Sequence, residues 1–128
     1  MNLRNRKFVR TVQIILGLYL VFVSISGFFQ LLPPPEFNEA GSAFLGALFN
    51  TGYIFYLMQI IFLFSGLLFI FNKWSAFGAI LLAPITVNIL AFHVFLDFTG
   101  WWMALIFAIL NVYLLAIHWP RYKPIFKR

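Results

Sequence analysis

The chain has 128 residues, of which 63% are hydrophobic, 21% are aromatic and 9% are charged. A soluble domain typically carries about 25% charged residues, so this composition excludes an ordinary water-soluble domain and favours a lipid bilayer as the solvent. The net charge of +6 would suggest nucleic acid in a soluble protein, but here its placement along the chain decides its meaning. The absence of Cys excludes disulfides, catalytic thiols and Cys-ligated metal or haem sites.

The first apolar segment runs from about residue 11 to residue 32 and follows a basic N-terminus. It ends at three consecutive prolines, residues 33–35, where a helix cannot continue. A signal peptide is the alternative, but its apolar core is typically about 7 to 15 residues long and precedes a small-residue cleavage site. Residues 28–32 offer no such site, so we expect a first transmembrane span.

A short stretch, residues 36–49, separates the prolines from the next long apolar segment. It begins with Glu36 and Glu39 and continues with small and apolar residues. It is too short to cross a hydrocarbon core of about 30 Å, so it either lies at the interface or extends the next helix. We favour a short interfacial helix in the first outer loop.

Three further apolar segments follow, at about residues 51–71, 76–96 and 101–119. Pro84 lies inside the third of these four spans and leaves the carbonyl of Ile80 without its usual donor, which predicts a kink. Pro120 ends the last span. The sequence therefore predicts an all-α membrane protein with one domain, residues 1–128, folded as a four-transmembrane-helix bundle.

The charged residues orient this bundle. The N-terminus, the second loop and the C-terminus hold all nine Lys and Arg, whereas the first and third loops hold all three acids. The positive-inside rule then gives an N-in/C-in, multi-pass protein of the plasma (inner) membrane. The same division puts Trp74, Trp119 and Tyr122 at the inner interface and Trp101 and Trp102 at the outer one. The positive charge is thus read as an orientation signal, and nucleic acid is not expected as a partner.

Small and amide residues form a stripe on each of the first two predicted spans. Such stripes let helix backbones approach each other and let amides bond across, so we expect them to be helix contact faces. The stripes comprise Gln13, Gly17, Ser24 and Gly27 on the first span, and Gly52, Gln59, Gly66 and Lys73, spaced by seven residues, on the second.

The third span carries the most polar side chains. Thr86, His93 and Asp97 follow at intervals of seven and four residues and share one helix face. Asn88 lies about 140° around the helix from His93 and is expected to meet another neighbour. His93 lies about one turn below the outer surface, at a depth close to that of Asp97 and Gln30. Two interpretations stay open: an outward-facing polar pocket, or a histidine that bonds Asp97 or a backbone carbonyl and pins the helix end.

In the pocket interpretation, His93 is a hydrogen-bond or proton-exchange group and the amides orient a quinone or another lipid. The candidate ligand-binding residues are His93, Asp97, Asn88, Gln59, Gln30 and Thr86. His118 lies at the opposite end of the bundle, at a level differing by roughly 20 to 25 Å from that of His93, so the two cannot ligate one haem iron. The chain also lacks the clustered His and carboxylate ligands of a metal site, and no cofactor is assigned.

A family resemblance rests mainly on the third span. Residues 82–97 read LAPITVNILAFHVFLD, and they follow NTGY at residues 50–53 and SGLL at residues 65–68. With these motifs the chain resembles the DoxX-like family of small four-helix membrane proteins. The resemblance implies an inner-membrane bundle and an association with redox complexes, since relatives include the small subunit of a thiosulfate:quinone oxidoreductase. Many family members carry a Glu shortly before the Gly-Leu-Leu motif, and Phe62 stands at the matching place here, which weakens any transfer of proton or quinone chemistry.

Three functions are compatible with these residues. The sequence offers no nucleophile, acid–base pair or metal cluster, so we first expect a non-catalytic subunit or assembly factor that binds another membrane protein or a second copy of itself. The alternative is a binder of a quinone or other lipophilic ligand around His93. An outward proton or cation pathway ranks last, because it has only Asp97, Glu36 and Glu39 near its mouth and no acid at mid-depth.

Overall fold

A computed structural model describes residues 4–31 and 36–127 of the chain, and this part is helical without strands. The prediction of an all-α protein is therefore confirmed. The elements are α1 (Arg6–Phe29), α2 (Glu39–Asn50), α3 (Ile54–Ile70), α4 (Ser75–Phe95), α5 (Trp101–Ile117), α6 (Trp119–Tyr122) and the 3₁₀ helix η1 (Lys123–Phe126).

Two of these helices are long and apolar enough to cross a membrane by themselves, α1 with 24 residues and α4 with 21. The helices α3 and α5 have 17 residues each, shorter than the predicted segments, and span about 25 Å at 1.5 Å per residue. The chain bends by 88° between α2 and α3 and by 65° between α5 and the segment Trp119–Phe126. The described residues thus contain two candidate spans, or up to four if each bent pair counts as one, and the chain has the helices of a membrane protein.

The first helix ends earlier than the sequence predicts. The chain leaves α1 at Gln30, which has the left-handed conformation with φ of 50°. The N–H groups of Gln30 and Leu31 both donate to the carbonyl of Ser26, which closes the helix end. This closure comes before the prolines at residues 33–35, which lie outside the described residues.

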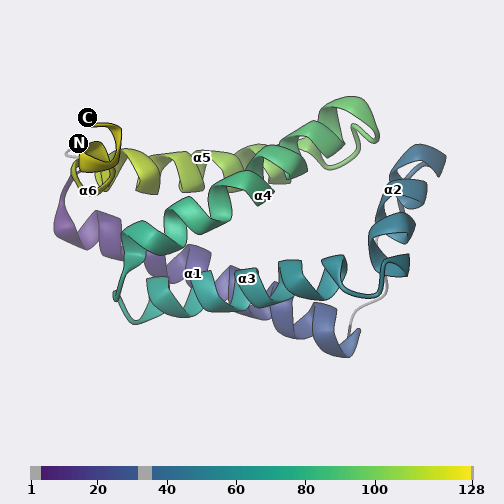
Figure 1. Cartoon of the computed structure of the whole chain (residues 1–128), viewed down its shortest axis with the longest axis horizontal. Coiled ribbons are helices and arrows are strands. Elements are labelled where there is room, and N and C mark those ends of the chain that lie inside the picture. Colours follow the sequence, from purple (N-terminus) through teal and green to yellow (C-terminus); the bar gives the residue numbers. More distant parts are fainter. Residues whose placement is uncertain (1–3, 32–35, 128) are drawn as a thin grey trace.

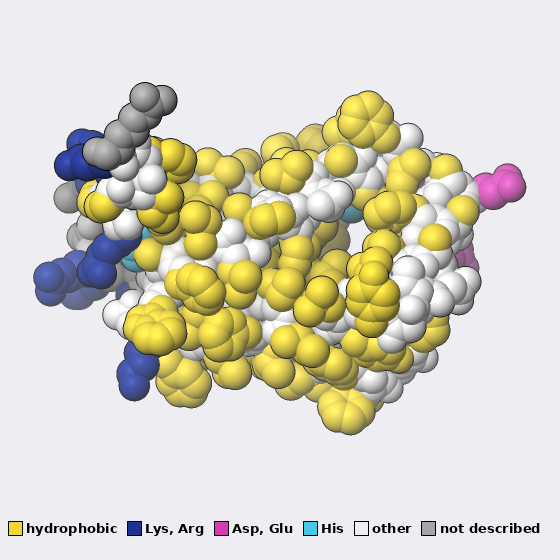
Figure 2. Space-filling model, viewed as in Figure 1, with side chains coloured by type: hydrophobic (Ala, Val, Ile, Leu, Met, Phe, Trp, Pro, Cys, Tyr) yellow, Lys and Arg dark blue, Asp and Glu magenta, His cyan; other side chains and the backbone are white. Residues whose placement is uncertain are grey.

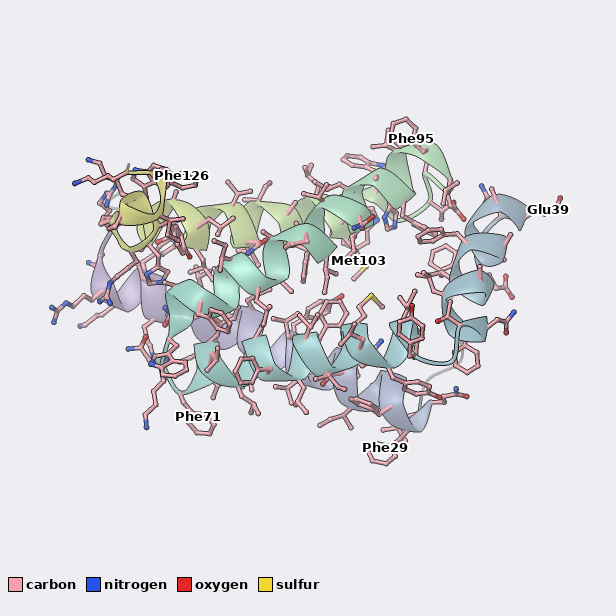
Figure 3. The ribbon with its side chains drawn as sticks, viewed as in Figure 1. Phe29, Glu39, Phe71, Phe95, Met103 and Phe126 are labelled. Carbon is pink, nitrogen blue, oxygen red and sulfur yellow. The ribbon has the colours of Figure 1, made fainter. Side chains whose placement is uncertain are left out.

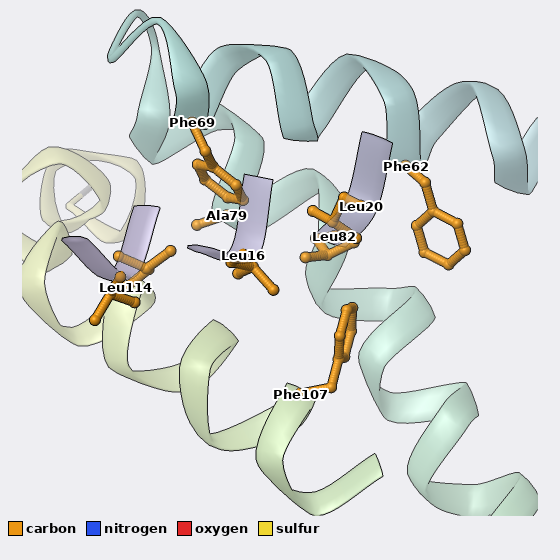
Figure 4. Close-up of a cluster of buried hydrophobic side chains, with 9 residues drawn as sticks. Leu16, Leu20, Phe62, Phe69, Ala79, Leu82, Phe107 and Leu114 are labelled. Atoms are coloured by element: carbon orange, nitrogen blue, oxygen red, sulfur yellow. The ribbon is translucent and has the colours of Figure 1, made fainter. Parts of the chain in front are cut away.

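The four long helices lie alongside one another (Figure 1). α1 packs most extensively against α3, while α4 lies between α3 and α5. Both termini lie at one end of the molecule, and α2 crosses the other end (Figure 1). The buried core between the long helices contains Val12, Leu16, Leu20, Phe62, Phe69, Ala79, Leu82, Phe107 and Leu114 (Figure 4).

Glycines bring the backbones of α1 and α3 into direct contact. A Cβ atom on Gly17 would lie 2.8 Å from the carbonyl oxygen of Gly66, and one on Gly66 would lie 2.9 Å from the carbonyl oxygen of Gly17. Farther along the same pair, a Cβ on Gly27 would lie 2.5 Å from the amide carbon of Gln59. These contacts confirm that the two stripes meet, and they leave no room for a side chain at either crossing.

The ends of the second stripe were predicted wrongly. Gly52 and Lys73 lie in the turns that flank α3, and both are exposed. Gly52 has a positive φ of 83°, which an L side chain rarely adopts, so its role is to form the turn between α2 and α3. The seven-residue spacing continued past the helix because α3 is shorter than the apolar segment that contains it.

At the end of the molecule that holds the termini, two side chains, Arg10 and Tyr122, join helices by hydrogen bonds to backbone carbonyls. The guanidinium of Arg10 donates to the carbonyl of Phe69 at 2.6 Å and to that of Ile70, so it caps the C-terminus of α3. The hydroxyl of Tyr122 donates to the carbonyl of Ala76 at 2.5 Å. Tyr122 is buried, so its ring packs within the protein.

We expect Gly17→Ala to lower the free energy of unfolding by about 1 to 3 kcal/mol, because the added methyl group must separate two backbones that now touch. The matched control is Gly46→Ala in α2, where a Cβ would meet nothing within 4 Å. That change should be neutral or stabilise the chain by up to about 1 kcal/mol. Thermal unfolding in detergent measures both, and equal effects of the two substitutions would contradict the glycine contact.

Candidate functional site

A cavity of about 430 Å³ lies between α2, α3 and α4, at the end of the molecule away from the termini. The space-filling view shows the surface hollowed there (Figure 2). Except for one amide and one imidazole, its walls are apolar. The lining residues are Phe37, Phe44, Leu45, Leu48, Ile54, Leu57, Met58, Ile61, Phe62, Ile85, Asn88, Ile89, Phe92 and His93.

His93 contributes the imidazole, and its ring has a defined orientation. Its Nδ1 atom lies 2.9 Å from the carbonyl oxygen of Ile89, one turn earlier in α4. A carbonyl oxygen can only accept, so Nδ1 carries the hydrogen in this contact. The other ring nitrogen, Nε2, has no hydrogen-bond partner within the described part of the chain. In its neutral form the ring therefore offers Nε2 as an unoccupied acceptor.

Asn88 contributes the amide and lies five residues before His93 in α4. Its Nδ2 group donates to the carbonyl of Pro84 at 3.0 Å. One N–H of the amide is thus used within the helix, and the carbonyl oxygen and the second N–H stay available. The cavity consequently holds two neutral polar groups within an apolar wall.

Asn38 fixes α2 across this end of the molecule. Its backbone N–H donates to Oδ2 of Asp97 at 2.6 Å, and its Nδ2 group donates to the carbonyl of Leu96 at 2.6 Å. Its Oδ1 atom accepts from the N–H of Gly41 at 2.8 Å and so caps the start of α2. One residue therefore begins α2 and attaches it to the chain that leaves α4.

Asp97 is 3% exposed and accepts two backbone N–H groups, from Asn38 and from Thr99 at 2.9 Å. These hydrogen bonds to the charged form hold the pKa of Asp97 below its ordinary value of 3.8, with a smaller electrostatic contribution from His93. The carboxylate is thus engaged in holding α2 in place. It lies beside the cavity and is not among the residues that line it.

Aromatic rings close the side of the cavity between α2 and α4. The ring of Phe92 meets that of Phe37 edge-on, with centroids 5.0 Å apart, and lies 5.8 Å from that of Phe44. A Cβ on Gly41 would lie 3.0 Å from Phe92 Cζ, which is tighter than an ordinary contact, so α2 packs closely on α4 at this residue. These contacts bring α2 against the same turn of α4 that carries His93.

The structure brings two of the six predicted site residues together at the cavity and places the other four elsewhere. His93 and Asn88 both line the cavity, which corrects the expectation that Asn88 meets a different neighbour. Asp97 lies beside them and anchors α2. Gln59 is buried against Gly27 at the α1–α3 contact. The other two, Gln30 and Thr86, do not line the cavity either.

Gln30 is exposed and ends α1, outside the cavity lining. Thr86 does not share the surroundings of His93, although the two were predicted on one face. Its hydroxyl lies 2.8 Å from Oδ1 of Asn111, whose Nδ2 group donates to the carbonyl of Ala79 at 3.1 Å. Thr86 and Asn111 are both buried, so this pair joins α4 to α5 near Pro84.

The open alternatives for His93 are both partly met. The ring bonds a backbone carbonyl near the end of α4, as the structural interpretation expects, and it also lines the cavity. Sequence reasoning missed Asn38, Gly41 and Phe92. An Asn directly before Glu39 is a helix N-cap signal, which could have identified Asn38. Its contact with Asp97 could not be found in this way, because Asp97 lies 59 residues away in the sequence.

No group of three or more His, Cys, Asp or Glu that could hold a metal ion occurs in residues 4–31 and 36–127. The chemistry that the site offers is hydrogen bonding to a guest held by apolar contacts. The walls could hold a lipophilic cofactor or ligand, with His93 and Asn88 meeting its polar atoms.

The charge of Asp97 should make stability depend on pH. Because the folded state lowers the pKa of Asp97, the carboxylate stabilises the fold above its ordinary pKa, and this contribution is lost as the pH falls through the folded value. We expect Asp97→Asn to lower the melting temperature at neutral pH and the difference from the wild type to narrow below about pH 4. A difference that stays constant with pH would contradict the role assigned to the carboxylate.

Comparison of the chain with models of known protein families, with curated proteins and with solved structures finds no match. The resemblance to the DoxX-like family therefore stays a prediction from the motifs at residues 50–53, 65–68 and 82–97. The function proposed below rests on the geometry of the cavity.

Proposed function

We propose that the chain is a four-span, N-in/C-in protein of the plasma (inner) membrane that binds a lipophilic molecule in the cavity between α2, α3 and α4. The observation that carries the proposal is the cavity itself, with about 430 Å³ of space, apolar walls and two neutral polar groups. Ligand sites of this kind bury the apolar body of a guest and use a few polar groups to orient it.

The distribution of charge along the molecule supports the proposed topology. Lys and Arg side chains gather at the end that holds both termini, and acidic side chains gather at the opposite end (Figure 2). Glu39 lies at the end opposite Phe71 and Phe126 (Figure 3). Large hydrophobic side chains are exposed along the length of α1, α3, α4 and α5, as a surrounding bilayer requires. In this orientation the cavity lies toward the outer side.

The walls of the cavity indicate the class of guest. No Lys, Arg, Asp or Glu is found among its lining residues, so a strongly charged molecule would lose hydration without gaining a partner. A lipid with a small neutral polar head fits this lining, for example the reduced, hydroxyl-bearing form of a quinone. The motif resemblance at residues 82–97 adds support for a redox-associated lipid. The apolar lining gives no support to a proton or cation pathway.

The role of a non-catalytic subunit or assembly factor, as a homo-oligomer or with another membrane subunit, stays a prediction from the sequence. The residues that the structure describes offer no feature that selects a particular protein partner. Both roles are compatible, because a subunit can also hold a lipid.

The topology can be tested with single introduced cysteines, since the chain has none of its own. We expect Ser42→Cys, exposed in α2, to react with a membrane-impermeant maleimide added to intact cells. Lys127→Cys, exposed near the C-terminus, should react only after the membrane is permeabilised. Labelling of both positions from the same side would contradict the N-in/C-in proposal.

Ligand binding can be tested by filling the cavity. Ile61 lines it, whereas its neighbour Ile60 is 52% exposed on the outer surface of α3. We expect mass spectrometry of the gently purified protein to detect a co-extracted lipophilic molecule, and Ile61→Trp to reduce its occupancy at least about tenfold by occupying its space.

The matched variant Ile60→Trp should keep that occupancy, provided that both variants melt near the wild type. If both variants retain the co-extracted molecule equally, that molecule binds outside the cavity. Absence of any bound molecule, together with no change in melting on addition of lipophilic probes, would overturn the proposed function.

A further inference from the structure

We propose that the cavity selects neutral lipophiles that carry a hydroxyl group over those whose polar atoms only accept hydrogen bonds. This inference rests on the proposed function and specifies the chemical class of the guest. The inference is based on the imidazole of His93, which a hydrogen bond to the carbonyl of Ile89 holds in place. This ring lines an apolar cavity whose other polar side chain is Asn88.

The orientation of His93 determines what it can offer. Its Nδ1–H is directed to the carbonyl of Ile89 at 2.9 Å, so that hydrogen is not available to a guest. The neutral ring has no other N–H, and Nε2 therefore acts only as an acceptor. A guest hydroxyl can donate to it, whereas an ether, a ketone or an ester leaves it unpaired, and an unpaired polar group in an apolar site weakens binding.

Asn88 reinforces this preference without determining it. One of its two N–H bonds is directed to the carbonyl of Pro84 at 3.0 Å. Its oxygen adds a second acceptor and its remaining N–H adds one donor. A hydroxyl both donates and accepts, so it can use His93 together with Asn88. A carbonyl or ether oxygen on the guest can use only the single remaining N–H.

The surroundings of the cavity favour a neutral guest. The lining residues, all within the described chain, include no cation to hold a carboxylate or phosphate and no acid to hold an ammonium group. Phe62 is buried and adds an apolar ring to the wall. Asp97 is the acid that interacts with His93, and its carboxylate already accepts the N–H groups of Asn38 and Thr99.

The test compares two probes of similar size, para-heptylphenol and its methyl ether. In the ether a methyl group replaces the hydroxyl hydrogen, so only the phenol can donate a hydrogen bond. The purified full chain in detergent is incubated with an equimolar mixture at about pH 8, where imidazole is mostly neutral. Native mass spectrometry then counts each probe on the protein. The cavity-filled variant Ile61→Trp gives the background from partition into the micelle. We expect the phenol to exceed the ether about fivefold above that background, the effect of one net hydrogen bond.

Two variants test whether His93 causes the preference for the phenol. His93→Phe keeps a ring of similar shape but removes the imidazole acceptor, so it should lose most of the phenol preference and keep only the part that Asn88 supplies. His118→Phe removes the other histidine, near the termini and outside the cavity lining, and should keep the phenol preference. If His93→Phe does not fold, the comparison of the two probes on the wild type still decides the proposal.

The outcomes separate this inference from the function on which it rests. Binding of both probes above background with equal occupancy overturns the hydroxyl preference and leaves the lipophile site in place. Binding of neither probe above background overturns the proposed function as well. A phenol preference as large in His93→Phe as in the wild type overturns the assignment to His93.

Discussion

The backbone contact between α1 and α3 at Gly17 and Gly66 is the constraint on which the other packing contacts depend. Each glycine faces the carbonyl of the other, so α1 and α3 pack backbone to backbone and α1 covers one side of α3. Gly27 extends the contact by accommodating the amide of Gln59. The opposite side of α3 is left to α4, and α5 then packs on α4. Without small residues at these crossings the helices could not approach so closely.

The cavity follows from how α3 and α4 separate. The two helices share a short turn at the end that holds the termini and move apart toward α2 (Figure 1). α2 is too short to fill the gap as a fifth long helix, and it crosses this end instead because the chain bends by 88° at the start of α3. Asn38 and Asp97 hold the start of α2 in place, so the space is bounded by three helices. The buried carboxylate has a structural use here, and its charge is stabilised by backbone N–H groups.

The polar residues of α4 show why a helix face does not identify a site. Thr86 and His93 differ by seven residues and lie on nearly the same side of an ideal helix, but about 10 Å apart along its axis. Over that distance the neighbour changes from the buried amide of Asn111 to the open cavity. Asn88 and His93 point about 140° apart in an ideal helix, yet both reach the cavity, because a wide space is lined by more than one helix face.

The sequence by itself determined the helical class, the membrane character, the segregation of charge and the small-residue contact of α1 with α3. These properties depend on composition and on spacing within single helices, which are local in the chain. It also identified His93 and Asn88 as residues of interest. Only the tertiary structure decided that these two share a cavity, that Thr86 and Gln59 do not, and that Asn38 and Gly41 complete its surroundings. The reason is that helix ends, the bend before α3 and the separation of α3 from α4 are set by contacts between residues far apart in sequence, such as Asn38 with Asp97.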